Sequence, residues 1–555
     1  MTTAETTGAA APPSAATHAG RRHEAEQGGG LTGTWTMVRF ILRRDRVRLV
    51  VWIVGITLLV LSTAASIEGL YPTQADLDKA AQTANDNAAL IALNAPSYAL
   101  DTLGGQAVFN VGSFGYAVMA LMGMFLVGRH TRADEENGRT ELLRATVLGR
   151  NAPVTAVLVV AAGAFAVLGG LISLSMVSQD LPTAGSVLYG AAMGAFGLLF
   201  ACVTAVTVQV TEQNRAALGF AGVLLGASYV LRAIGDVGDG TLSWASPMGW
   251  AQAARPYAGE RWWTLLLLAG AAIVCVAVAF ALLAVRDLGG GLVPPRPGPP
   301  IASAALVGSR FGLPLRLQRA SLISWTVGLG LAGVSYGSVG QDVRDLIGSN
   351  NAFEDIIAQG GGSLTDAFFT TSLLVLALIA GGFAISSTLR LRSEEAGGRA
   401  EPLLATGLGR TPWVTSYLAV ALGGCAALMA AAGFGMGLTY GVAVHDLGQV
   451  GRLVGAAVAF VPALWVLVGV TLVLFGFAPR ATAAAWGALV VCFVIGLFAQ
   501  LLSLPGWLVD VSPFQHVPAM PSQGFEWTPV VALTATAVVL MVAGIVGFRR
   551  RDAGF

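Results

Sequence analysis

The chain has 555 residues, of which 55% are hydrophobic and 11% are charged, and its formal net charge is +1. Ordinary soluble domains carry about 25% charged residues, so this composition excludes an ordinary soluble enzyme or binding domain. Repeated apolar runs of about 20 residues indicate a protein that crosses a membrane several times.

Sites for nucleotides and metals are not evident in the sequence. Lys79 is the only lysine among 32 basic residues, and no glycine-rich loop precedes it. A phosphate-binding P-loop requires a lysine after its glycines, so we expect no ATP site of that kind in this chain. The four cysteines lie in apolar runs and the five histidines are scattered. We therefore expect no bound metal, no cofactor and no catalytic residue.

The N-terminal region changes character near residue 35. Residues 1–34 are rich in Ala, Thr, Gly and Pro and lack a hydrophobic core, which predicts a disordered cytoplasmic tail rather than a signal peptide. Residues 35–49 combine apolar side chains with five arginines. Such a basic amphipathic segment before a span is typical of a helix in the headgroup plane.

Twelve apolar runs follow, six in each half of the chain, which predicts an all-α membrane protein with twelve transmembrane helices. The predicted spans of the first half are 49–69, 108–128, 153–177, 186–210, 216–234 and 263–285. Those of the second half are 321–340, 367–389, 413–440, 453–476, 481–503 and 529–548. With both termini in the cytoplasm, 26 of the 32 basic residues lie on the cytoplasmic side, as the positive-inside rule requires. We expect a multi-pass protein of the cell membrane.

One charged stretch occurs twice between these spans. Residues 132–150 read RADEENGRTELLRATVLGR and residues 392–410 read RSEEAGGRAEPLLATGLGR, an offset of 392 − 132 = 260 without a gap. Arg215 and Arg286 also recur, at Arg480 and Arg551. The chain is thus predicted to hold a first six-helix unit (35–288), a Pro/Gly-rich cytoplasmic linker (289–314) and a second unit (315–555). Because each unit has an even number of spans, the copies are parallel about an axis along the membrane normal.

The repeated stretch has the chemistry of a docking element. Gly138 allows the chain to reverse, and Glu141 would lie in the first turn of a following helix, where its charge opposes the helix dipole. Leu142, Leu143 and Thr146 fall on one helical face. A solvated loop that only sets topology would need the arginines but not the recurring glutamates, glycine and threonine. The repeat therefore favours docking to a partner.

These features resemble a known family. The motif E-x-x-x-G-x-x-E-x-L-L-x-T between spans two and three, the basic helix before span one and the six-span unit are similar to ABC-2 type export permeases. The duplicated form resembles permeases of actinobacterial tetronasin-type, polyketide-antibiotic and multidrug exporters. Gly138-Arg139 and Gly398-Arg399 replace the usual G-T of the family motif, and Val147 and Gly407 stand where it has a proline.

The resemblance implies a permease that exports hydrophobic or amphiphilic compounds together with two copies of an ATP-binding cassette subunit, which would bind ATP and magnesium. No nucleic-acid partner is expected. The repeated stretch would form coupling helices that touch the ATPase through Glu135, Gly138, Arg139, Glu141, Leu143 and Thr146, and through Glu395, Gly398, Arg399, Glu401, Leu403 and Thr406. The basic helices would be connecting elbows that include Arg43, Arg46 and Trp52, and Arg316, Arg319 and Trp325.

The substrate path is only weakly marked. The family places it between the two halves, which gives as candidates Phe109, Asn110, Phe114, Tyr116, Phe368 and Phe369. Few ionisable groups lie deep in the spans, which argues against a proton relay and suits an apolar cargo.

Two other classes of function stay open. A twelve-span secondary carrier would share the parallel repeat but needs ion-coupling carboxylates within its spans, and none is evident. A membrane scaffold without transport activity would also fit the spans. The sequence does not identify the cargo.

Overall fold

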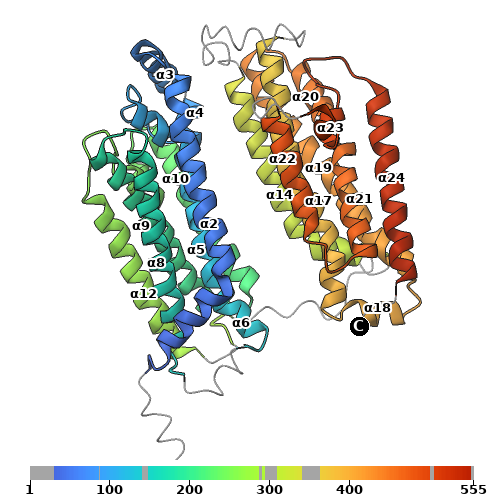
Figure 1. Cartoon of the computed structure of the whole chain (residues 1–555), viewed down its shortest axis with the longest axis horizontal. Coiled ribbons are helices and arrows are strands. Elements are labelled where there is room, and N and C mark those ends of the chain that lie inside the picture. The colour runs from blue at the N-terminus through green and yellow to red at the C-terminus, as the bar shows by residue number, and fades with distance from the viewer. Residues whose placement is uncertain are drawn as a thin grey trace, which may run out of the picture. The chain divides into compact units, whose positions relative to one another are not determined.

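The computed structural model describes residues 30–86, 88–139, 148–286, 290–293, 309–340, 363–499 and 505–551. The chain divides into unit 1 (Met1–Pro297) and unit 2 (Gly298–Phe555), shown in Figure 1. The division falls inside the predicted linker 289–314, of which residues 289 and 294–308 lie outside the described part. The described residues form helices and one isolated β-bridge, between Thr211 and Val293.

Unit 1 contains ten α-helices in its described part and one short 3₁₀ helix, Leu242–Ala245. The α-helices are α2 (Thr34–Leu70), α3 (Gln74–Asp86), α4 (Ala88–Leu93), α5 (Leu103–His130), α6 (Arg132–Glu136), α8 (Ala152–Val177), α9 (Thr183–Val210), α10 (Asn214–Val237), α11 (Pro247–Gln252) and α12 (Thr264–Val285). In Figure 1, α3 and α4 lie at one end of the unit and α6 at the other.

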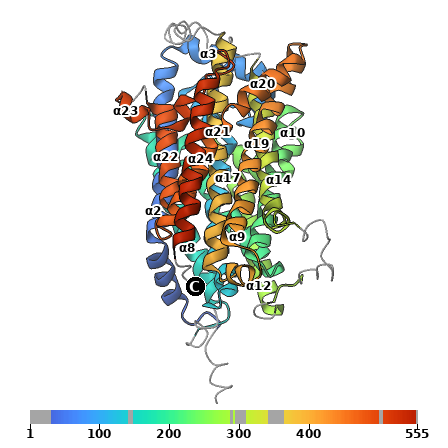
Figure 2. The same ribbon diagram turned by 90° about the vertical axis from the view of Figure 1, so that its right-hand side faces the viewer.

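Unit 2 repeats the order of long helices. Its α-helices are α14 (Gly312–Val339), α17 (Leu364–Ala396), α18 (Ala400–Ala405), α19 (Arg410–Ala443), α20 (Gly448–Val458), α21 (Val461–Phe477), α22 (Ala484–Phe498), α23 (Gly506–Val509) and α24 (Trp527–Arg550). Figure 2 shows its long helices running side by side, with α20 and α23 at the end opposite the C-terminus.

Ten helical segments in the described part of the chain are long and apolar enough to cross a membrane. Two of them join α5 to α6 and α20 to α21. The predicted seventh and eleventh spans coincide with α14, which has 28 residues, and α22, which has 15, but neither is among the ten. The chain is therefore a multi-pass membrane protein, and the predicted count of twelve is not confirmed.

Equivalent helices pack against one another in the two units. In unit 1, α9 lies at the centre and contacts α5, α8, α10 and α12, while α2 packs on α5 and α8. In unit 2, α21 takes the central place against α17, α19, α22 and α24, while α14 packs on α17 and α19. Small residues permit close approach of such helices. A Cβ atom on Gly190 of α9 would lie 2.2 Å from the carbonyl oxygen of Gly169 in α8.

The basic segment 35–49 continues directly into the first span as part of α2, a helix of 37 residues. At 1.5 Å per residue it is about 55 Å long, longer than a hydrocarbon core of about 30 Å. Met37, Val38 and Ile41 are buried against unit 1, whereas Arg43 and Arg46 are exposed. The structure thus joins the predicted headgroup helix to the span, while Trp35, Phe40 and Leu42 of this segment stay exposed.

Candidate functional site

The repeated stretch begins with a chain reversal in both units. Gly138 and Gly398 have positive φ angles of 68° and 67°, a conformation that glycine adopts without steric cost. In unit 2 the reversal leads into α18, which has Glu401 in its first turn as predicted. Residues 140–147 of unit 1 lie outside the described part, so the corresponding helix there stays a prediction.

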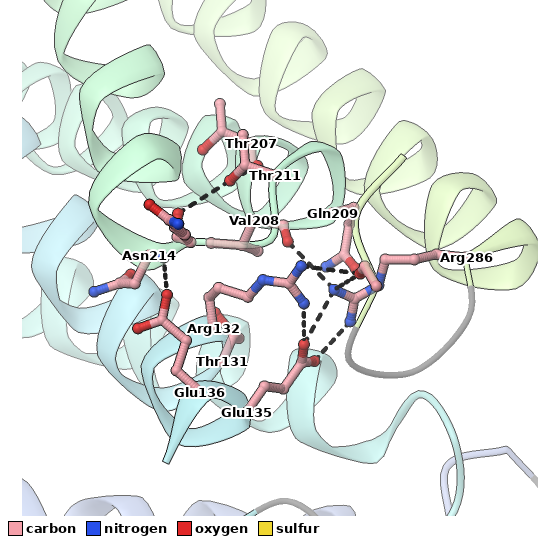
Figure 3. Close-up of polar contacts among 12 residues, drawn as sticks. Thr131, Arg132, Glu135, Glu136, Thr207, Val208, Gln209, Thr211, Asn214 and Arg286 are labelled. Atoms are coloured by element: carbon pink, nitrogen blue, oxygen red, sulfur yellow. Dashed lines mark hydrogen bonds and ion pairs between the residues drawn. The ribbon is translucent and has the colours of Figure 1, made fainter. Parts of the chain in front are cut away.

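A polar cluster built on two buried arginines and one exposed arginine anchors the start of this stretch in unit 1. We call Arg132, Glu135, Arg150 and Arg286 brace 1 (Figure 3 shows three of them). Arg286 binds Glu135 with both terminal nitrogens, at 2.6 Å and 3.1 Å, and Arg132 pairs with the same carboxylate. Arg150 donates to the carbonyl oxygens of Leu283 and Arg286, at 2.6 Å and 2.8 Å. Such charge-assisted and bidentate contacts are among the strongest hydrogen bonds in proteins.

Unit 2 contains the equivalent cluster, brace 2, formed by Arg392, Glu395, Arg410 and Arg551. Arg551 binds Glu395 at 2.7 Å, and Arg392 pairs with Glu395 at 3.4 Å. Arg410 donates to the carbonyl oxygen of Arg551 at 2.8 Å. Each member occupies the repeat position of a brace 1 residue.

The braces connect the stretch mechanically to three parts of each unit. Glu135 follows α5, Arg286 ends α12, and Arg150 precedes α8. The side chains of Arg132 and Arg286 are only 1% and 3% exposed, so these charges depend on their partners for solvation. A displacement of the loop must therefore move the ends of the long helices or break buried ion pairs.

A second, more exposed pair flanks each brace. Arg139 contacts Asp134 at 3.1 Å, and Arg399 contacts Glu394 at 2.7 Å. The hydrogen bond with Glu394 and the charge of that carboxylate raise the pKa of Arg399. The two arginines are about half exposed, so each presents its charge at the edge of the reversal.

Comparison with known proteins identifies the family. A family model described as the C-terminal domain of the multidrug efflux system permease Rv1217c matches residues 307–549. The multidrug efflux system permease protein Rv1217c of Mycobacterium tuberculosis (strain ATCC 25618 / H37Rv) is 42% identical over 530 residues, covering 95% of this chain and 96% of that protein. The chain belongs to the Rv1217c efflux-permease family. The resemblance to multidrug exporter permeases is thereby confirmed at the level of the permease.

The predicted docking residues of this permease do not all face outward. Glu135 and Glu395 lie inside the braces, where the Glu395 side chain is 3% exposed. Leu403 packs against the core of unit 2. Arg399, Glu401 and Thr406 are exposed, and Gly398 forms the turn. Of the unit 1 positions, Gly138 and Arg139 are described, whereas Glu141, Leu143 and Thr146 lie outside the described residues. The docking role itself stays a prediction.

The predicted elbow residues of the permease differ in exposure: the arginines are exposed and the tryptophans are half-buried. Arg43, Arg46, Arg316 and Arg319 are exposed. Trp52 and Trp325 are half-buried and lie 6.4 Å from aromatic rings of the following long helix, Phe125 and Phe383 respectively. In both helices the basic side chains thus face outward, and a tryptophan packs against the helix's own unit.

The substrate candidates are dispersed. Tyr116 is buried between the rings of Tyr189 and Phe196, Phe109 is buried beneath the α3–α4 segment, and Phe369 is buried beside Tyr440. Phe368 is half-buried against Phe369. Only Asn110 and Phe114 lie on the surface of their unit, with Phe114 66% exposed.

The exposure of Phe114 follows from a break in α5 at Gly112. This residue has φ 47° and ψ −148°, and a Cβ atom there would lie 2.7 Å from the carbonyl oxygen of Asn94. That oxygen accepts hydrogen bonds from the backbone nitrogen and the hydroxyl of Ser113, each at 2.6 Å. The segment after α4 therefore caps the second part of α5.

Sequence reasoning named Glu135 and Glu395 and missed the six other members of the braces as site residues: Arg132, Arg150, Arg286, Arg392, Arg410 and Arg551. The sequence contained a signal for them, because each of these arginines recurs at its repeat position. Among the described residues, no group of three or more His, Cys, Asp and Glu side chains is placed to hold a metal.

A further charged contact is specific to unit 1 and joins α2 to α5. The buried Asp45 contacts His130 at 2.7 Å and Arg129 at 3.3 Å. In unit 2 the repeat positions of Asp45 and His130 hold Gln318 and Arg390. Gln318 accepts from Ser387 at 2.6 Å, and Arg390 pairs with Glu394 at 2.7 Å. The contact between Gln318 and Ser387 thus joins α14 to α17, whereas the pair of Arg390 and Glu394 lies within α17.

Replacing Asp45 by alanine should destabilise unit 1 by about 3 kcal/mol, because it leaves Arg129 and His130 without this carboxylate. The measurement is thermal unfolding of the purified chain. The double substitution D45Q/H130R copies unit 2 and should recover most of the loss by pairing the new arginine with Asp134. Equal unfolding temperatures for D45A and wild type would contradict this interpretation.

Proposed function

We propose that this chain is the permease subunit of an ATP-driven ABC-2 type exporter that moves hydrophobic or amphiphilic compounds, such as drugs and polyketide-type antibiotics, out of the cell. Its family relative is described as a multidrug efflux system permease. We propose that ATP and magnesium bind to separate subunits, a proposal supported by the lack of a lysine-bearing P-loop in this sequence. Two copies are proposed, one for each repeated stretch.

The observation that carries this proposal is the presence of equivalent braces in both units. A loop that only sets topology needs no buried connection to the helix ends. A loop that transmits force does need one, and each brace supplies it through Glu135 with Arg286 or Glu395 with Arg551. Nucleotide-driven movement of the docked subunits would pull both loops and, through the braces, the ends of the long helices in each unit.

The proposed topology has twelve spans. If α14 and α22 cross the membrane together with the ten helical segments already described, each unit has six spans. The arginine-rich braces and both termini are then cytoplasmic, in keeping with the positive-inside rule. The exposed Asn110 and Phe114 are the proposed cargo contacts, and an aromatic ring suits an apolar compound.

The energy source of export, ATP or the proton gradient, tests this proposed function. Cells that produce the permease and its ATPase should continue to export a lipophilic dye after an ionophore has collapsed the proton gradient, provided that ATP is kept at its normal level. Cells that lack the permease are the control. Loss of export with the gradient would indicate a secondary carrier, and equal dye retention with and without the permease would indicate a scaffold.

A further inference from the structure

Helix α2 carries a row of arginines and aliphatic residues along one face. Side chains that are three or four positions apart on a helix lie one above the other. We call the residues at this spacing stripe 1: Arg43, Arg46, Val50, Val54 and Leu58. Its two arginines are exposed, and its three aliphatic side chains are 48–59% exposed. The described part of unit 1 therefore leaves this face of α2 uncovered.

Unit 2 repeats this row on α14, at an offset of 316 − 43 = 273 residues. Stripe 2 consists of Arg316, Arg319, Ile323, Val327 and Leu331. Its arginines are exposed, and its aliphatic side chains are 54–62% exposed. Each residue of stripe 1 thus has an exposed residue of the same kind at its repeat position. The two units present the same combination of charge and apolar surface.

The arginines of the two stripes lack a protein counter-charge. Among the described residues, none of the four takes part in an ion pair or a side-chain hydrogen bond. The ion pairs of the basic part of α2 use its other arginines: Arg44 contacts Asp134 at 2.6 Å, and Arg48 contacts Asp45 at 3.7 Å. Asp45 is buried, and it is the only acidic residue between positions 30 and 67. The sequence has no acidic residue between positions 309 and 340. These surfaces therefore suit an anionic partner.

The length of each stripe matches one leaflet of a bilayer. The second arginine and the last aliphatic residue are 58 − 46 = 12 positions apart in stripe 1, and 331 − 319 = 12 in stripe 2. This separation corresponds to a rise of about 18 Å, and half of a hydrocarbon core is about 15 Å. Exposed aliphatic side chains of a span contact acyl chains, so the arginines before them lie at the level of the lipid headgroups.

Contact between two such stripes, within one chain or between copies, would bring four arginines together. Repulsion of like charges disfavours that arrangement. A lipid with an anionic headgroup instead satisfies both parts of a stripe, because its phosphate complements the arginines and its acyl chain covers the aliphatic residues.

We propose that each stripe binds one anionic phospholipid, with the headgroup phosphate at the two arginines and an acyl chain along the aliphatic residues. Arginines three positions apart are neighbours on a helix, so both can donate hydrogen bonds to one phosphate group. A zwitterionic headgroup carries an ammonium group that repels arginine, so the site prefers lipids with net negative charge. The site on α14 rests on the proposed crossing of the membrane by this helix. Neither site depends on transport activity.

Native mass spectrometry of the purified, delipidated full-length chain tests the proposal. Phosphatidylglycerol should bind roughly tenfold more tightly than phosphatidylcholine with the same acyl chains. The variants R43Q/R46Q and R316Q/R319Q should each lose one of the tightly bound phosphatidylglycerol molecules. The matched control R549Q/R550Q removes two exposed arginines at the end of α24 and should keep them all. Equal affinities for the two lipids, unchanged binding in either stripe variant, or the same loss in the control would overturn the proposal.

Two measurements on the wild-type chain do not depend on the folding of any variant. Inorganic phosphate should not displace the bound phosphatidylglycerol, because it has no acyl chain to cover the aliphatic residues. A structure of the chain in phosphatidylglycerol nanodiscs should show a headgroup phosphate within hydrogen-bond distance of Arg43 and Arg46, and another at Arg316 and Arg319. Displacement by inorganic phosphate, or stripes without a lipid phosphate at their arginines, would overturn the proposal.

Discussion

Replacing Glu135 and Glu395 together by glutamine should abolish drug-stimulated ATP hydrolysis while the ATPase remains bound. Each glutamine keeps the size of the side chain but removes the charge that holds Arg286 or Arg551. Loss of one partner from a buried ion pair costs about 3–5 kcal/mol, enough to detach the loop from the last long helix of its unit. The exposed residues of α18 are unchanged, so docking should persist.

The measurement is ATP hydrolysis by the reconstituted complex with and without a transported drug, together with co-purification of the ATPase. The control is Glu526→Gln, which removes an exposed carboxylate just before α24. We expect at least a tenfold loss of stimulation in the double variant and normal stimulation in the control. Full stimulation in the double variant would show that the braces do not transmit movement.

Reversing the charge at Glu141 and Glu401 together should separate the permease from its ATPase. Glu401 is exposed in the first turn of α18, and its charge opposes the positive end of the helix dipole. An arginine there would lose this interaction and would reverse the charge of the proposed docking surface. Glu141 is the repeat position in unit 1 and lies outside the described residues.

Co-purification from detergent measures this effect directly. We expect the E141R/E401R variant to insert into the membrane normally but to retain less than a tenth of the ATPase, and therefore to lose stimulated hydrolysis. Glu526→Arg reverses an exposed charge elsewhere and should behave as wild type. Undiminished activity of E141R/E401R would refute a docking role for these glutamates.

The sequence alone predicted the membrane class, the position of most long helices and the glycine reversal. These features depend on local composition: apolar runs satisfy their backbone as helices in lipid, and Gly138 and Gly398 tolerate positive φ. The predicted number of spans is not confirmed: the predicted run 481–503 corresponds to α22, which has 15 residues.

The side-chain partners could not be derived in the same way. The apolar face of the repeated stretch was interpreted as a surface for a partner, but Leu403 and Leu404 of α18 pack on their own unit. An apolar stripe predicts that one face of a helix is buried, but it does not identify the surface that buries this face. Likewise Glu135 and Arg286 are 151 residues apart, so their pairing depends on how α5 and α12 are placed by the whole unit.

The exposure of the predicted substrate-path residues could not be derived from the sequence either. Tyr116 and Phe114 lie two positions apart, yet Tyr116 is 1% exposed and Phe114 is 66% exposed. The break at Gly112 and the packing of α9 against α5 decide between these outcomes, and neither is readable from aromatic content.

We propose that each repeated stretch docks one ATP-binding subunit. The most direct test is the stoichiometry of the purified, transport-active particle, combined with cross-linking from a Thr406→Cys variant, since Thr406 is exposed at the end of α18. Two ATPase subunits per chain, with one cross-linked through position 406, are predicted. A particle that transports drug without any ATPase, or an unreacted cysteine at position 406 in a complete complex, would contradict the account.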